Sequence, residues 1–79
     1  MTMNIVYNSQ HYHVVEYPGR NGFELIDKTL GLTGYLEGEI ADAFRQSLEQ
    51  LIIEDPTVDT VDAFLGGFES LMVQPVRFH

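Results

Sequence analysis

The stretch EIADAFRQSLEQLIIE, residues 39–54, is where the hydrophobic pattern of the chain changes. Within it, apolar residues recur every three or four positions, which places them on one face of an amphipathic helix. These residues are Ile40, Phe44, Leu48, Leu51 and Ile52. Asp55-Pro56 ends the helix, because the residue before a proline is disfavoured in the helical conformation. We expect the apolar face of this helix to cover a sheet formed by the preceding residues.

Before residue 39, the chain has the alternating, β-branched and aromatic composition of strands, interrupted by turn residues. The clearest turns are Asn8-Ser9-Gln10 and Pro18–Gly22. Between them the pattern predicts strands at 3–7, 12–17 and 23–27, and a short fourth strand at 35–36. Strands joined by short turns pair antiparallel, so the sequence predicts a meander of three to four strands.

After Pro56, either Thr57 or Asp59 can cap a second helix by accepting backbone N–H bonds. Helical spacing then continues through Val61, Phe64, Leu65, Phe68, Leu71 and Met72. Two adjacent glycines cost about 1 kcal/mol each inside a helix, so this helix is expected to be kinked or broken at Gly66-Gly67. Pro75 ends it, and 76–79 are expected to form an extended tail or an edge strand.

The order of these elements predicts an α+β fold, ββββαα, with both helices packed on one face of the sheet. The 79 residues are too few to stabilise two cores, so residues 1–79 are predicted to form a single domain. A chain of this size buries only about 60% of its unfolded surface, and a dimer interface is a common supplement. We therefore expect a homodimer.

Charge and composition exclude several classes of function. Twelve acidic and four basic residues give a formal net charge of -8, which repels nucleic acid and anionic membranes and favours a basic protein partner. Cysteine is absent, which removes disulfides and thiolate chemistry. The sequence contains no signal-peptide pattern and no apolar stretch of about 20 residues, so we expect a cytoplasmic protein.

Several segments resemble a known family. They are Met3–Ser9, Val14–Pro18, Val61–Phe68 and Gln74–Val76, and together they span nearly the whole chain. This sequence is similar to a family of small, uncharacterised bacterial proteins, a domain of unknown function found mainly in beta-proteobacteria. The resemblance implies a short, stand-alone cytoplasmic protein, and it transfers no catalytic residue.

A metal site is one functional hypothesis. His11 and His13 are two residues apart, and on a strand such side chains point to the same face, where two imidazoles can share a metal ion. A third ligand would come from Glu16, Glu24 or His79. His-x-His pairs also occur without a metal, and no Cys or His cluster completes this one. The sequence therefore predicts no cofactor, and His11 and His13 are only weak metal candidates.

Aromatic and acidic clusters have functional and structural interpretations. The tyrosines at 7, 12, 17 and 35, with Phe23, could line a ligand groove, but such residues are more often cross-strand packing. Glu54, Asp55, Asp59 and Asp62 form the densest acidic run, which does not fit a calcium loop and is explained by helix capping and a solvated surface. No nucleophile, base or cofactor signature is present, so no enzyme activity is expected.

The sequence thus favours a non-enzymatic cytoplasmic protein-interaction module that forms a homodimer and binds a further protein partner. Apolar residues beyond one helix face supply the interface candidates: Ile53, Phe68, Leu71 and Met72. The alternative is a small-ligand-binding or metal-binding regulatory protein that uses His11, His13 and the sheet tyrosines. A third hypothesis treats the acidic surface as a decoy for a nucleic-acid-binding protein.

Overall fold

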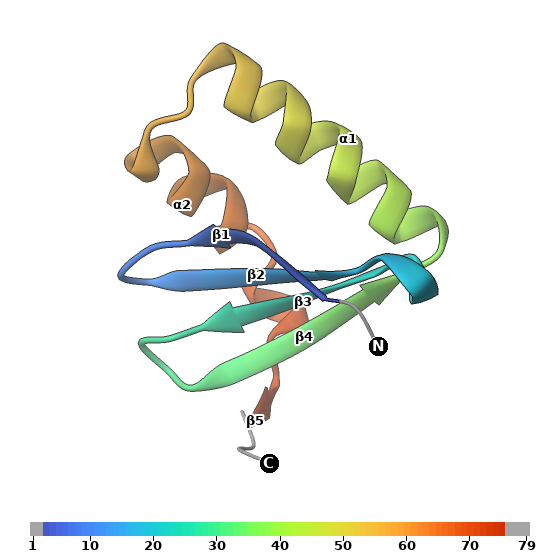
Figure 1. The fold of residues 1–79 in the computed structure, drawn as a ribbon. Coiled ribbons are helices and arrows are strands. Elements are labelled where there is room, and N and C mark those ends of the chain that lie inside the picture. Colours follow the sequence, from blue (N-terminus) through green and yellow to red (C-terminus); the bar gives the residue numbers. More distant parts are fainter. Residues whose placement is uncertain (1–2, 76–79) are drawn as a thin grey trace.

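The computed structural model describes residues 3–75 and shows an α+β fold, in which two helices cover one face of a five-stranded antiparallel sheet (Figure 1). The strands are β1 (Asn4–Asn8), β2 (Tyr12–Tyr17), β3 (Gly22–Asp27), β4 (Leu32–Glu37) and β5 (Gln74–Pro75). The helices are α1 (Glu39–Glu54) and α2 (Val58–Gly66), with 3-10 turns η1 (Pro18–Arg20) and η2 (Glu69–Leu71). The strand order β1-β2-β3-β4-β5 contains the predicted meander.

Local chemistry closes the turns of the meander. In the β3–β4 turn, the buried carboxylate of Asp27 accepts backbone N–H bonds from Thr29 at 2.9 Å and Leu30 at 3.0 Å. Gly31 follows with φ of 68°, a left-handed conformation that glycine adopts without strain. Because this turn is so compact, β4 begins at Leu32 and is longer than the predicted 35–36 strand.

Helix α1 has the bounds that the sequence predicts, and it buries Ala41, Phe44 and Leu48 against the sheet. Its predicted apolar face is too wide, because Ile40 and Ile52 are exposed. Only the narrower stripe through Phe44 and Leu48 belongs to the buried core. Ile52 therefore lies at the margin of the core, in a position that contributes to the surface of the protein.

Helix α2 begins and ends as its capping residues predict. Thr57 is the N-cap, and its hydroxyl accepts the backbone N–H of Thr60. The Asp55 carboxylate stabilises the same turn by accepting the hydroxyl of Thr60 at 2.8 Å. The hydrogen bond from Thr60, followed by those from Thr57, lowers the pKa of Asp55. At the other end the helix stops at Gly66 and η2 follows, which confirms the predicted break.

The fifth strand exceeds the predicted count of three to four. The end of η2 passes over β4 at Gly34, and the chain then pairs Gln74 with Thr33. The edge strand expected at 76–79 lies outside the described residues, whereas Gln74 and Pro75 themselves form β5. Proline is tolerated there because it lies in an edge strand, where its missing N–H removes no central hydrogen bond.

The core lies between the sheet and the helices. Four phenylalanines pack with ring centroids 5.0–5.8 Å apart, a spacing that favours tilted aromatic contacts: Phe23, Phe44, Phe64 and Phe68. The largest fully buried side chains are those of Val14, Phe23, Leu25, Val61, Leu65 and Met72. Within residues 3–75, no helix is long and apolar enough to cross a bilayer.

Candidate functional site

The most distinctive surface is the edge formed by β1. This strand pairs with β2 on one side, and no other element of residues 3–75 pairs with its outer side. The outward N–H and C=O groups of an edge strand are a template for another extended chain. Several side chains of this edge are apolar and exposed, namely Met3, Ile5 and Val6.

A bulge shapes the edge. The register passes from Ile5 opposite Val15 to Tyr7 opposite Val14, so Val6 is the extra residue. A bulge re-aims side chains that would otherwise alternate between the two faces. Here Val6 and Tyr7 both lie on the side of the helices: Val6 lines a groove with α1, and Tyr7 contacts α2.

Tyr7 anchors the strand to the second helix. Its hydroxyl donates to Oδ1 of Asp62 at 2.8 Å, and Ser9 Oγ donates to the same atom at 2.9 Å. Burial, followed by the bond to Asp62, raises the pKa of Tyr7. These bonds fix the carboxyl end of β1 from one side and leave its outer backbone groups accessible.

The groove between β1 and α1 has a volume of about 130 Å³. Its apolar lining consists of Val6, Phe23, Leu48 and Ile52. Val6 and Ile52 form its rim, with 36% and 39% of their surface exposed, whereas Leu48 and Phe23 belong to the core at its base. The groove is therefore an opening from the surface onto the buried core, directly beside the free strand edge.

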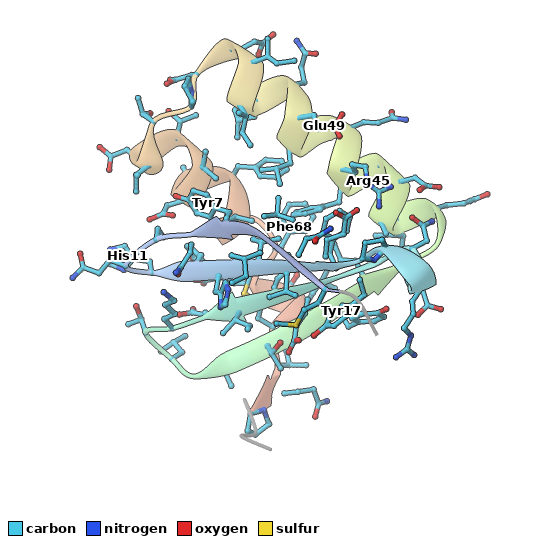
Figure 2. The ribbon with its side chains drawn as sticks, viewed as in Figure 1. Tyr7, His11, Tyr17, Arg45, Glu49 and Phe68 are labelled. Atoms are coloured by element: carbon cyan, nitrogen blue, oxygen red, sulfur yellow. The ribbon has the colours of Figure 1, made fainter. Side chains whose placement is uncertain are left out.

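Three charged residues complete the lining: Glu16, Arg45 and Glu49. Arg45 donates to Glu16 Oε2 at 2.9 Å and lies 3.3 Å from Oδ1 of Asp42. Its guanidinium also stacks over the ring of Phe23, at 5.0 Å from the centroid. Figure 2 shows Arg45 and Glu49 projecting from α1 beside the groove.

The two histidines are in different surroundings. His11 lies at the end of the sheet and points away from it (Figure 2), with Nδ1 at 3.4 Å from the Thr29 hydroxyl. His13 lies within β2 opposite Ile26, and its Nε2 is buried without a partner in the described part of the chain. Residues 3–75 contain no group of three or more His, Cys, Asp or Glu placed to hold a metal ion. His79 lies outside the described residues.

The sheet tyrosines do not form one groove. Tyr7 and Tyr12 contact α2 and η2, whereas Tyr17 and Tyr35 lie together at 6.2 Å between ring centroids. Tyr12 donates to Glu69 at 2.7 Å and Tyr17 donates to Glu24 at 2.9 Å. The pKa of Tyr12 rises to about 12, through burial and then the bond to Glu69. Tyr12 also lines a surface hollow of about 480 Å³ with His11, and Tyr17 and Tyr35 line a separate hollow of about 310 Å³.

The four interface candidates differ in exposure. Ile53 is 77% exposed on α1, next to the groove residue Ile52, and Leu71 is also exposed. Phe68 is half-buried in the aromatic cluster. Met72 is only 1% exposed within the core, because the chain turns inward where η2 crosses β4, so it offers no surface for an interface.

Sequence reasoning did not single out Val6, Glu49 or the groove. The bulge that turns Val6 toward α1 has no glycine or proline to mark it. The helical spacing predicts that Ile52 lies on the buried face of α1, whereas its side chain is 39% exposed. The sequence contains one indication that an isoleucine of this helix is exposed, the adjacent pair Ile52-Ile53. Two consecutive isoleucines cannot both lie on one narrow stripe of a helix.

Comparison with known proteins gives the family. The family model described as "Protein of unknown function (DUF3567)" matches residues 3–79. The chain belongs to this family. It is also 42% identical, over 85 aligned residues, to Protein BTH_I0359 of Burkholderia thailandensis, covering 98% of this chain and 100% of that protein. The predicted resemblance to a beta-proteobacterial family of unknown function is confirmed. No solved structure matches the chain.

Proposed function

We propose that this protein is a non-enzymatic protein-interaction module that binds an extended segment of a partner along the outer edge of β1. One observation carries the proposal: a strand edge without a pairing element in residues 3–75 lies directly beside an apolar groove. Strand addition uses both features, since main-chain hydrogen bonds supply affinity and side-chain pockets supply specificity. A cytoplasmic location and the absence of enzyme activity are part of the same proposal.

The dimensions of the groove favour a side chain over a free small molecule. Pockets for drug-sized ligands usually measure about 300–1,000 Å³, whereas this groove measures about 130 Å³. A partner strand beside β1 directs every second side chain toward the helices. One apolar side chain of the partner then enters the groove between Val6 and Ile52, onto the core at Leu48.

The proposal includes a homodimer. Ile53 and Leu71 are exposed apolar side chains that neither the core nor the lining of the groove uses, and they are the contact candidates. A contact that uses Ile53 leaves the outer backbone of β1 available for a different partner. Self-association and partner binding are therefore separate parts of this function, and each has its own test.

Selection from a displayed library of random peptides tests strand addition. Peptides of about ten residues are long enough for a strand of typical length. The selected peptides are then titrated against the wild-type protein and against Val6→Asp and Leu30→Asp. We expect Val6→Asp to weaken binding at least about tenfold, because binding must desolvate the new carboxylate. Leu30 is also an exposed apolar residue, at 63% against 36% for Val6, but it lies in the β3–β4 turn, so Leu30→Asp should bind as the wild type does.

Amide chemical shifts locate the bound peptide. Strand addition predicts the largest changes at Asn4–Asn8 and at the groove residues of α1. Peptides that bind Val6→Asp as tightly as the wild type, or that shift residues away from β1, would show that the proposal is wrong. Circular dichroism of both variants checks that a loss of binding does not reflect a loss of fold.

A further inference from the structure

The helical layer above the groove is strongly acidic. From Glu39 to Gly66, the chain contains one basic residue, Arg45, and seven acidic residues. The acids are Glu39, Asp42, Glu49, Glu54, Asp55, Asp59 and Asp62. A partner strand on β1 places half of its side chains on this side of the sheet. Those side chains enter a negative potential.

The positive charge of Arg45 does not balance the groove. Its guanidinium is already shared between Glu16 at 2.9 Å and Asp42 at 3.3 Å, and it also donates to Asn21 Oδ1 at 3.3 Å. Glu49 lines the same groove and has no ion-pair partner among residues 3–75. The Glu49 carboxylate beside the groove is therefore available to pair with a basic group of another molecule.

We infer that the segment bound along β1 carries an apolar residue and a Lys or Arg two positions apart, so that the apolar side chain enters the groove and the basic side chain, on the same face, pairs with Glu49. This inference deepens the proposed function and rests on it. Side chains two positions apart on a strand share a face and lie about 7 Å from each other, which the length of Lys or Arg can span to an acidic neighbour. The partner is a basic protein segment.

A second copy of this chain fits the edge less well. Its own β1, with the sequence NIVYN, contains no Lys or Arg that could pair with Glu49. Two copies would also bring together two molecules with a formal charge of -8 each. Charge complementarity at this edge therefore favours a basic partner over self-pairing of β1.

The charge content of the selected peptides tests the inference. Selection on the wild-type protein, with subtraction of peptides that also bind Val6→Asp, should enrich Lys and Arg and deplete Asp and Glu at positions two residues from an apolar residue. A selected peptide is then compared with its analogue in which every Lys and Arg is replaced by Glu. The basic peptide should bind at least about tenfold more tightly, and added salt should weaken it.

Two matched charge reversals on α1 locate the contact. Glu49→Lys should weaken the basic peptide about tenfold and remove part of its salt dependence, whereas Glu54→Lys should not change its affinity. Glu54 is on the same helix but lines the opposite flank, beside Phe64. Both residues are exposed, so neither variant should disturb the fold.

The outcomes separate this inference from the proposed function. Peptides that bind at Asn4–Asn8 without a charge preference, or that bind Glu49→Lys and Glu54→Lys equally well, would overturn the basic partner and leave strand addition intact. If no peptide depends on Val6, strand addition itself is wrong, and the inference falls with it.

Discussion

Tyr12 links strand β2 to the 3-10 turn η2. It is buried, and its hydroxyl donates to the carboxylate of Glu69 in η2 at 2.7 Å. Burial and this bond both favour the neutral phenol and raise the pKa of Tyr12 from 10.0 to about 12. Because the pKa is higher in the folded state, the resulting stability is complete below pH 10 and is lost as the pH rises toward 12.

Replacing Tyr12 with Phe tests this coupling. At neutral pH, Tyr12→Phe should lower the free energy of unfolding by about 1.5–3 kcal/mol, the range for a hydrogen bond to a charged group. Between pH 10 and about 12 the difference from the wild type should shrink, because only the wild type has this phenol to ionise. Urea denaturation of both proteins across this range measures the difference. A difference that stays constant through pH 12 would contradict the assignment.

The end of η2 packs closely against β4 at Gly34. At Gly34 a β-carbon would overlap the backbone carbonyl of Leu71, and backbone atoms have little freedom to move aside. Glycine is therefore required where the returning chain crosses β4 toward β5. This crossing also carries Met72 into the core beside the sheet.

Gly34→Ala should separate β4 from this segment. We expect a loss of about 1–3 kcal/mol in the free energy of unfolding, as for other overpacked sites, together with faster hydrogen exchange in β5. Gly19→Ala is the matched control, because a β-carbon at Gly19 meets nothing within 4 Å. Equal stability of the two variants would show that the crossing is not tightly packed.

Local sequence patterns predicted the helices and most strands correctly, but they did not predict the pairing between segments far apart in the chain. The bounds of α1, the cap at Thr57 and the break after Gly66 follow from short-range backbone chemistry that the sequence displays. Strand β5 depends on pairing between Gln74 and Thr33, which no neighbouring residues encode. The groove could not be predicted from the sequence either, since it depends on the bulge at Val6 and on the position of α1 beside β1.

At the scale of the whole molecule, the formal charge of -8 affects self-association and partner binding in opposite directions. Two copies repel each other, whereas a basic segment is attracted. Salt screens both effects, since the Debye length falls from about 30 Å at 0.01 M to about 3 Å at 1 M. Added salt should therefore strengthen a homodimer and weaken the complex with a basic peptide.

Sedimentation equilibrium at low and high salt measures the first effect. We expect a dimer at high micromolar concentration whose dissociation constant decreases as salt is added. Ile53→Asp should weaken this dimer at least about tenfold, because the contact would then bury a carboxylate, whereas Leu30→Asp should not. A protein that stays monomeric at every salt concentration would rule out the homodimer. A dimer lost in Val6→Asp and retained in Ile53→Asp would place the second copy on β1, the edge that charge complementarity assigns to a basic partner.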